Sequence, residues 1–404
     1  MRSVEEHQRV VAELITARPA VSAGLVDAEG LALAADVAAA VSLPVFDNSA
    51  MDGYAVRAAE VASATVEHPV TLPVAEDIPA GRTDIPTLAP GTAHRIMTGA
   101  PMPAGATAVV PVEDTDGRTD VVTITAPTAE GRHIRRAGGD VAAGTTVLRA
   151  GQPATPAVVG LAAALGLSEL TVIPRQRVLV ISTGTELVPA GTPLQPGQIY
   201  ESNSVMLAAA VRDAGGEVVA APTAGDDVAQ FGALLDRYAA RDGGVDLIVT
   251  SGGVSAGAYE VVKDAFGRDG DQGVQFVKVA MQPGMPQGLG RVAGTPIVTL
   301  PGNPVSALVS FEVFIRPALR AAMGLPHPDR PRRSAVLAET LTSPRGKRQF
   351  RRGVFDADAG TVLSYGPPAS HHLRWLASAN CLLDIGEDVT EIAAGSALQI
   401  WDLS

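Results

Sequence analysis

Residues 177–310 alternate between short apolar runs and helix-like stretches, and this alternation constrains the fold of the chain more than any other feature. Apolar runs of strand length occupy residues 177–182 and 245–250, and a helix-like pattern covers residues 204–214. That pattern ends at Gly215 and Gly216, which fits the left-handed backbone that commonly follows a helix. The sequence therefore predicts a three-layer α/β domain with a mostly parallel sheet between two layers of helices.

Further elements continue the same alternation. We expect a strand at residues 217–220, a helix that begins near Asp226 or Asp227, a helix from about residue 258, and strands at residues 274–279 and 296–300. The links between these elements are short, as is usual for βαβ units.

The sequence on either side of this domain follows other patterns. Residues 3–15 predict a helix that begins with a capping box formed by Ser3 and Glu6. Residues 44–141 contain short apolar runs separated by proline and glycine, which indicates an all-β module. Helix-like sequence returns at residues 155–167. Beyond about residue 331 the helix signal disappears, and several apolar runs predict a small β domain with strands at residues 335–337, 362–365, 381–385 and 398–401.

A β module with helical sequence on both sides indicates an insertion into a helical framework. We therefore divide the chain into four parts: residues 1–43 and 142–172 as a discontinuous framework domain, 44–141 as an inserted β domain, 173–328 as the α/β domain, and 329–404 as a C-terminal β domain. The α/β domain is where we expect a binding site, because ligands of open parallel sheets bind beyond the carboxyl ends of the strands.

The composition disfavours several classes of partner. Lys and Arg number 31 against 43 Asp and Glu, so the formal net charge is −12, and aromatic residues make up only 4%. Such a chain is poorly suited to bind nucleic acid or an anionic membrane through its general field. Cys381 is the single cysteine, which rules out an internal disulfide. Early acidic residues and the lack of an apolar run of ~20 residues lead us to expect a soluble, cytoplasmic protein.

Three loops that follow predicted strands carry unusual sequence. They are Ser-Thr-Gly-Thr-Glu at residues 182–186, Thr-Ser-Gly-Gly-Val-Ser at 250–255 and Leu-Pro-Gly-Asn-Pro at 300–304. Small residues let backbone N–H groups approach a phosphate closely, and Asn303 with Pro304 suits the start of a helix. Each loop alone is more often plain turn chemistry, but three at neighbouring strand ends predict a phosphate or anion pocket. None matches the common kinase or dehydrogenase phosphate motifs.

Charged residues accompany these loops. Glu186, Asp226, Asp227 and Glu260 are either solvated carboxylates and helix caps or oxygen ligands of Mg²⁺, which one or two carboxylates hold together with substrate phosphates. Residues 345–352, which we call the basic segment, contain five Lys or Arg residues. This segment is either a solvated strand edge or a positively charged rim over a bound anion.

Five motifs resemble those of the molybdopterin molybdenumtransferase family, the bacterial MoeA family, which is similar to the E domain of gephyrin. They lie at residues 44–56, 95–103, 181–186, 250–255 and 300–307, so the resemblance extends over most of the chain in the same order. It implies an elongated homodimer with the four parts described above and a β-barrel-like C-terminal domain. It also implies a Mg²⁺-dependent reaction in which molybdate is inserted into adenylylated molybdopterin to give molybdenum cofactor and AMP.

The resemblance assigns roles to the residues that match the family's motifs. The catalytic residues it implies are Asp52, Thr98, Asp140 and Glu186, and the metal ligands are Asp226 and Glu260. It implies that molybdate binds beside Lys278, Pro286, Lys347 and Ser370. It implies that molybdopterin and its nucleotide contact residues of the three loops, namely Thr183, Gly184, Ser251, Gly252, Gly253, Ser255, Pro301, Gly302 and Asn303.

The chain departs from the family pattern mainly around the expected molybdate site. Gln282 and Met285 stand where many relatives carry lysine. Lys347 stands where arginine is usual, and Glu260 stands where we expect aspartate. A charge-assisted hydrogen bond contributes more binding free energy than a neutral one. We therefore expect the absence of these two lysines to affect the binding of molybdate.

Three alternatives remain open at the level of sequence. One is a non-enzymatic scaffold whose anion site has decayed, a second is an insertase for another oxyanion such as tungstate, and a third is a different nucleotide enzyme built on the same α/β module. Intact Asp52, Asp140 and Glu186 count against decay, whereas Gln282 and Met285 count for it. Besides a second copy of the chain, a molybdopterin adenylyltransferase is a candidate partner.

Overall fold

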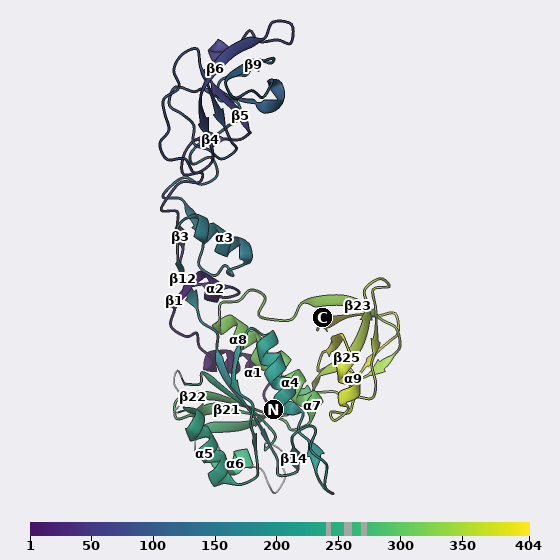
Figure 1. The fold of residues 1–404 in the computed structure, drawn as a ribbon. Coiled ribbons are helices and arrows are strands. Elements are labelled where there is room, and N and C mark those ends of the chain that lie inside the picture. Colours follow the sequence, from purple (N-terminus) through teal and green to yellow (C-terminus); the bar gives the residue numbers. More distant parts are fainter. Residues whose placement is uncertain (240–243, 254–260, 268–272) are drawn as a thin grey trace.

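The structure, a computed structural model, describes residues 1–239, 244–253, 261–267 and 273–404. The chain forms an elongated molecule in which the α/β domain and the C-terminal β domain lie together at one end (Figure 1). The inserted β domain lies at the other end, and the framework domain connects the two. Among the described helices, none is long and apolar enough to cross a membrane.

The α/β domain is built on a sheet that is parallel over most of its width, as predicted. In the described residues the strand order is β16-β13-β18-β22-β21-β19, and β17 also pairs with β13. The first four strands are parallel, whereas β21 runs antiparallel to both of its neighbours. The bounds are Glu217–Ala220 for β16, Arg177–Thr183 for β13, Leu247–Ser251 for β18, Thr295–Leu300 for β22, Pro286–Val292 for β21, Val274–Lys278 for β19 and Thr223–Ala224 for β17.

No strand is predicted at residues 286–292, where the structure has β21. A proline and two glycines weaken the strand propensity of this segment. The glycines are required by close packing, because a Cβ at Gly288 would overlap the Thr299 hydroxyl and one at Gly290 would overlap the backbone carbonyl of Gly273. Contacts with the neighbouring strands therefore stabilise a strand that local preference disfavours.

Helices cover both faces of the sheet and confirm the three-layer prediction. Val178 and Val180 of β13 point into one core and Leu179 and Ile181 into another. The first core includes residues of α1, α4, α7 and α8, and the second includes residues of α5 and α6. The bounds are Val4–Leu14 for α1, Asn203–Asp213 for α4, Val228–Ala239 for α5, Val261–Phe266 for α6, Pro304–Ser310 for α7 and Arg316–Ala322 for α8, with a π-helical turn at Phe311–Ile315.

Helix ends follow the sequence signals. The Ser3 hydroxyl accepts a hydrogen bond from the Glu6 N–H at 3.0 Å. Helix α4 is followed by Gly215, whose φ is +93°, as expected for the residue after a helix end. We expected a helix from about residue 258, and that start lies outside the described residues. Within them, helix α6 extends from Val261 to Phe266.

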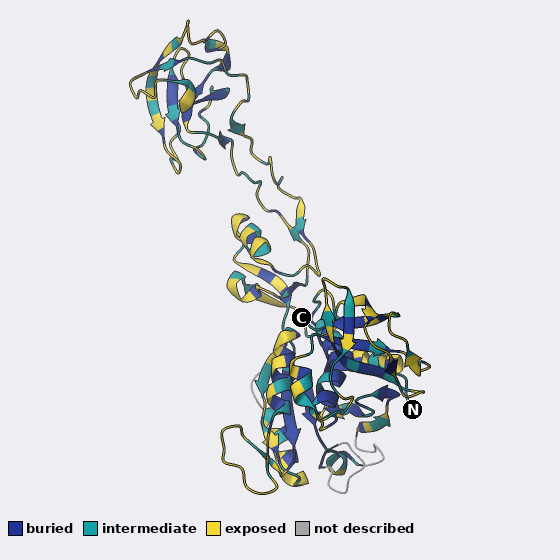
Figure 2. Cartoon of the chain, turned by 90° about the vertical axis from the view of Figure 1, so that its right-hand side faces the viewer, coloured by how far each residue is buried: buried dark blue, intermediate teal, exposed yellow. Residues whose placement is uncertain are grey.

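The framework domain has a small sheet in which β12 pairs with β1 and β2. Helices α2 and α3 contribute to its core, and β3 pairs with β11 where the chain leaves and re-enters. Many residues of the framework helices are exposed to solvent (Figure 2). The bounds are Val21–Gly24 for β1, Leu25–Ala28 for α2, Ala32–Leu33 for β2, Val37–Ala38 for β3, Thr146–Leu148 for β11, Pro156–Ala164 for α3 and Glu169–Ile173 for β12.

The inserted domain is an all-β module, as the short apolar runs predict. Its described residues form a sheet of order β8-β5-β7-β6-β9 and a separate pair, β4 with β10. Two short 3₁₀ turns lie at Ala58–Glu60 and Val112–Asp114. The bounds are Asn48–Ser49 for β4, Gly53–Val56 for β5, Val70–Ile78 for β6, Ala93–Ile96 for β7, Ala108–Pro111 for β8, Val121–Ile124 for β9 and Ile134–Arg135 for β10.

The C-terminal domain is a closed β-barrel, because its strands pair in a ring of order β25-β26-β23-β29-β27 and β27 pairs back with β25. Strand β20 of the preceding domain adds to β25 in parallel. Helix α9 (Leu373–Ala377) contradicts the expectation that helices are absent beyond residue 331. The sequence did not predict it because five residues are too few to show a helical period. The strand bounds are Met281–Gln282 for β20, Arg332–Leu337 for β23, Leu341–Thr342 for β24, Arg348–Asp356 for β25, Thr361–Ser364 for β26, Cys381–Ile385 for β27, Glu391–Ile392 for β28 and Ala397–Asp402 for β29.

Two further pairs of short strands occur in the described residues: β14 (Leu187–Val188) pairs with β15 (Ile199–Tyr200), and β24 pairs with β28.

Cys381 is buried in the barrel core. Burial raises the pKa of its thiol to about 12, so this sulfur stays protonated at neutral pH.

The close packing of β21 between β19 and β22 generates a stability prediction. Gly290→Ala should lower the free energy of unfolding by about 1–3 kcal/mol, because the added methyl group overpacks the strand pair. Urea unfolding followed by circular dichroism measures the change. The control is Gly232→Ala in α5, where a Cβ meets nothing within 4 Å and alanine favours the helix. A Gly290→Ala chain as stable as wild type would contradict this packing argument.

Candidate active site

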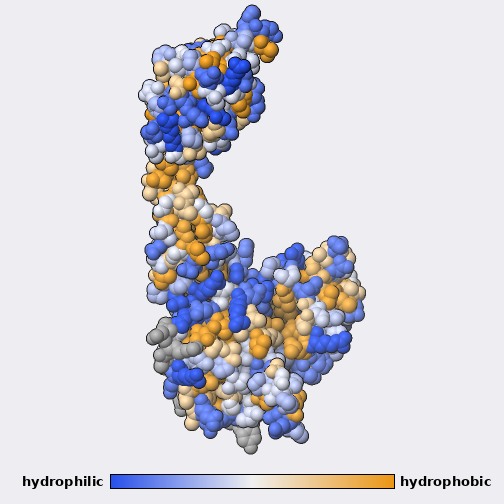
Figure 3. All heavy atoms as spheres, in the orientation of Figure 1, coloured by the Kyte–Doolittle hydropathy of each residue, from blue (hydrophilic) through white to orange (hydrophobic). Residues whose placement is uncertain are grey.

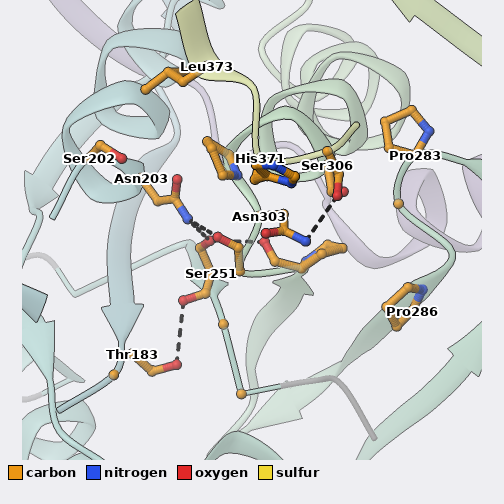
Figure 4. Close-up of a pocket in the computed structure, with 18 of the residues that line it drawn as sticks. Thr183, Ser202, Asn203, Ser251, Pro283, Pro286, Asn303, Ser306, His371 and Leu373 are labelled. Atoms are coloured by element: carbon orange, nitrogen blue, oxygen red, sulfur yellow. Dashed lines mark hydrogen bonds between the residues drawn. The ribbon is translucent and has the colours of Figure 1, made fainter. Parts of the chain in front are cut away.

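A cavity of about 1240 Å³ lies at the carboxyl ends of β13, β18 and β22 (Figure 4). The three loops predicted from the sequence line one side of it, and the segment 368–371 of the C-terminal domain lines the other. The cavity therefore lies between the α/β domain and the barrel. Thirteen of the residues expected to form the site line it: Thr183, Gly184, Glu186, Asp226, Ser251, Gly252, Gly253, Pro286, Pro301, Gly302, Asn303, Lys347 and Ser370.

Hydrogen bonds hold the three loops together. The Thr183 hydroxyl donates to the Ser251 carbonyl oxygen at 3.4 Å, and the Ser251 hydroxyl donates to the Pro301 carbonyl oxygen at 3.1 Å. Glycine is required at position 252, because its φ is +96° and a Cβ there would lie 2.7 Å from the Thr183 hydroxyl oxygen. The three loops therefore pack closely against one another along the floor of the cavity.

Asn203 links two of these loops and is not among the residues predicted from the sequence. Its Nδ2 donates to the Ser251 hydroxyl oxygen at 2.9 Å and to the Gly302 carbonyl oxygen at 2.6 Å (Figure 4). Its Oδ1 is buried and has no partner among the described residues. The only sequence signal for this role is an asparagine at the start of a helix, which by itself indicates a cap.

Asn303 has a different role from the one expected. It occupies the N-cap position of α7, with Pro304 next, but its side chain makes no capping hydrogen bond. Instead, its Nδ2 donates to the Ser370 hydroxyl oxygen at 3.0 Å, and the Val305 N–H donates to the Ser370 carbonyl oxygen at 3.0 Å. These bonds attach the barrel segment to the start of α7.

Carboxylates lie at the β13 end of the cavity. Asp226 accepts a hydrogen bond from the Thr185 hydroxyl at 2.7 Å. Asp227 accepts a hydrogen bond from the Gln230 N–H at the start of α5, so of the two roles considered for it, helix cap or metal ligand, it has that of a helix cap. Glu201, which the sequence analysis does not single out, is buried and accepts from two serines, Ser182 and Ser204. No group of three His, Cys, Asp or Glu suited to a metal occurs in the described residues. Two expected residues, Ser255 and Glu260, lie outside them.

The basic segment contributes one side chain to the cavity. Of its five cations, all described, Lys347 alone lines the cavity. Arg348 forms ion pairs with two carboxylates, and Arg351 and Arg352 donate to backbone carbonyls of the barrel. The idea that the whole segment forms a charged rim is therefore wrong, because strand β25 directs most of these side chains elsewhere.

Lys278 is not brought to the cavity lining. It is exposed at the end of β19, although its register partner Pro286 lines the cavity. Gln282 also lines the cavity, and its Oε1 accepts a hydrogen bond from Gln349 at 3.3 Å. Among the described lining residues, Lys347 is thus the one with a permanent positive charge.

Three expected catalytic residues lie in the inserted domain or at its base. Asp52 accepts hydrogen bonds from the N–H and the hydroxyl of Thr98, both at 2.7 Å. These bonds hold the pKa of Asp52 below its usual value, with the backbone bond as the main cause. Asp140 is exposed beside the bridge between Leu43 and Val141. Within one chain, the inserted domain lies at the opposite end of the molecule from the cavity (Figure 1).

The fold defines a multidomain α/β protein with a large cavity at the carboxyl ends of its parallel strands. Models of three protein-family regions match the chain: the MoeA N-terminal region (domain I and II) at residues 2–166, a probable molybdopterin binding domain at 179–321, and the MoeA C-terminal region (domain IV) at 334–403. The chain belongs to the MoeA family.

Relatives and solved structures agree with this membership. Molybdopterin molybdenumtransferase 2 of Mycobacterium tuberculosis is 74% identical over 408 residues, which cover 100% of both chains. Molybdopterin molybdenumtransferase 1 of the same organism is 38% identical over 99% of this chain and 98% of that protein. A crystal structure of the molybdopterin biosynthesis MoeA protein from Pyrococcus horikoshii has a TM-score of 0.82 at 29% identity and covers 100% of this chain and 99% of that chain.

These comparisons confirm the resemblance found in the motifs. They support a transferase of molybdenum cofactor biosynthesis. They give no support to a scaffold without activity or to an enzyme for tungstate.

The role of Asn203 generates a prediction about the cavity floor. Asn203→Ala should lower the free energy of unfolding by about 1–2 kcal/mol, because the Gly302 carbonyl and the Ser251 hydroxyl each lose a partner. Thermal and urea unfolding measure the effect. Ser202→Ala is the control, since Ser202 lines the same cavity but makes no capping hydrogen bond. Equal losses in both variants would refute a linking role for Asn203.

Proposed function

We propose that this chain inserts molybdate into adenylylated molybdopterin and releases AMP. The observation that carries the proposal is the cavity itself, which three loops of small residues line together with two carboxylates, Glu186 and Asp226, and one lysine, Lys347. Close relatives are named molybdopterin molybdenumtransferases, which supports the same substrates for this chain.

The phosphates of the substrate bind to the loops at the strand ends in this proposal. Gly184, the Ser251 to Gly253 turn and the Pro301 to Asn303 turn line the cavity side by side. Backbone N–H groups at such turns hold anions without a charged side chain. This arrangement suits a chain with a net charge of −12, whose overall field repels a phosphate.

Mg²⁺ fits the carboxylate end. Glu186 and Asp226 both line the cavity there, and Mg²⁺ is usually held by one or two carboxylates together with substrate phosphates. When bound, the ion would offset negative charge on the phosphates during AMP release.

Molybdate binds at the opposite end, beside Pro286, Lys347 and Ser370, in this proposal. Lys347 supplies the permanent positive charge among the described lining residues. Ser370 is held in place by Asn303, and Gln282 offers amide N–H groups because its carbonyl oxygen already accepts from Gln349.

The dependence on one lysine gives the main test of this function. Lys347→Ala should raise the molybdate concentration for half-maximal AMP release about ten- to hundredfold, which corresponds to roughly 1.4–3 kcal/mol. Gln282→Lys should lower that concentration, because it restores a cation at the cavity wall. The measurement is a molybdate titration of AMP release at fixed adenylylated molybdopterin and fixed ionic strength. Arg345→Ala is the control, since Arg345 is exposed and outside the cavity.

Superimposable titrations for wild type, Lys347→Ala and Gln282→Lys would show that molybdate binds elsewhere. A wild-type chain that releases no AMP from adenylylated molybdopterin when molybdate is added would refute the transferase function as a whole.

We further propose that the active form is a homodimer in which Asp52 and Thr98 of one chain complete the cavity of the other. The inserted domain projects far from the cavity of its own chain (Figure 1). Apolar side chains gather over the framework domain and its connection to the inserted domain (Figure 3). Val26 is 86% exposed and Phe46 48% exposed. Helix α3 is apolar on all sides, yet Ala162 is its one buried residue, and such helices are normally covered.

A complementation experiment tests the shared site. Asp52→Ala removes the carboxylate from the inserted domain, and Ser251→Trp fills the cavity of the α/β domain. Each variant alone should be inactive, whereas co-expressed chains should recover roughly a quarter of wild-type AMP release, because half of randomly formed dimers are hybrids with one intact site. Co-purified hybrids without activity would contradict the shared site.

A further inference from the structure

Residues 282–286, which we call the wall segment, form one side of the cavity, and all five of them line it (Figure 4). The segment leads from β20 to β21, and only its two ends belong to these strands. Pairing within the sheets therefore does not fix the residues between the ends. Their position must depend on other contacts.

Gln287, the residue that follows, holds the wall segment with its side chain. It is 1% exposed and is not among the residues that line the cavity. Its Nε2 donates to the Gly284 carbonyl oxygen at 2.6 Å and to the Ser310 hydroxyl oxygen at 2.7 Å. Because a carbonyl oxygen can only accept, the amide nitrogen must face Gly284. Both N–H groups of the amide are thus in use, and Gln287 has none to donate to a ligand in the cavity.

Close packing joins the wall segment to the same serine. Gly284 has a φ of +102°, and a Cβ there would lie 2.6 Å from the Ser310 hydroxyl oxygen. Glycine is therefore required at this position. Ser310 is fully buried and is the last residue of α7, so the wall segment lies directly against the end of this helix.

Helix α7 supports the opposite part of the site as well. At its start, Asn303 donates to the Ser370 hydroxyl, and its seven residues separate the two ends by about 10 Å. Val305, Ala307 and Val309 belong to the core beneath the sheet, which fixes the helix in place. One buried helix thus sets the distance between Ser370 and the wall segment.

We infer that Gln287 is a positioning residue, which fixes the wall segment against α7 through the Gly284 carbonyl and Ser310. This inference rests on the proposed function, in which Pro286 of the wall segment and Ser370 both contact molybdate. Loss of the amide leaves a buried carbonyl and a buried hydroxyl without their donor, and such groups are costly to leave unpaired. The wall segment then moves to regain partners, and Pro286 leaves the position that suits the anion.

Molybdate titration of AMP release on the full chain tests this role. Gln287→Leu keeps the bulk of the side chain and removes both donors. It should raise the molybdate concentration for half-maximal release about tenfold and leave the requirement for adenylylated molybdopterin unchanged. Ser310→Ala should act in the same direction, to a smaller extent. The double variant should be no worse than Gln287→Leu, because the bond between the two residues is already lost.

Gln176→Leu is the matched control. Gln176 is also 1% exposed, and its Nε2 donates to the Thr16 carbonyl oxygen at 3.0 Å. It directly precedes β13, so it lies at the amino end of the strand and the cavity at the other. This variant loses the same kind of bond and should leave the molybdate requirement unchanged.

Amide hydrogen exchange gives a second measurement that needs neither substrate nor activity. The Val279 N–H donates to the Met285 carbonyl oxygen at 2.8 Å, so slow exchange at Val279 reports a wall segment that is held in place. Exchange in residues 279–286 should be faster in Gln287→Leu than in wild type. It should stay at the wild-type rate in Gln176→Leu.

Four results would overturn the inference. These are unchanged exchange in Gln287→Leu, an unchanged molybdate requirement in that variant, an equal rise in the requirements for both substrates, and additive effects in the double variant. A wild-type chain without AMP release whose exchange still depends on Gln287 would refute the transferase function, while supporting the attachment of the wall segment by Gln287.

Discussion

The candidate site depends on the parallel pairing of β13, β18 and β22. Parallel strands end at the same edge of a sheet, and neighbouring strands lie ~4.8 Å apart, so loops separated by more than a hundred residues meet there. The pairing of Ser182 with Ser251 and of Ser251 with Leu300 brings the three loops together. Both faces of these strands are buried in separate cores, which prevents the strands from sliding out of register.

The barrel completes the site because it is attached to the α/β domain at two points. Strand β20, which contains Gln282, pairs with β25. Ser370 accepts hydrogen bonds from Asn303 and Val305 at the start of α7. These attachments bring Lys347 and the segment 368–371 to the cavity. Without them the loops of the α/β domain would form a floor with no opposite wall.

Local sequence patterns predicted the elements that are themselves locally determined. The apolar runs of β13 and β18, the Ser3 cap and the helix end before Gly215 all follow from short-range rules. Strand β21 was not predicted, because its glycines are required by close packing against the neighbouring strands and not by a local pattern. The basic segment also misled, since charge alone does not show that Arg348 is paired with carboxylates of other elements.

By itself, the sequence determined the fold class, the family and the loops that line the cavity, because these depend on periodicity and on motifs that are continuous in the chain. Tertiary structure alone decided which side chains face one another. Asn203 became the link between two loops, Lys347 was separated from its charged neighbours, and Lys278 was left outside the cavity. The physical reason is that hydrogen bonds and burial depend on distances between segments remote in sequence, and no local pattern records those distances.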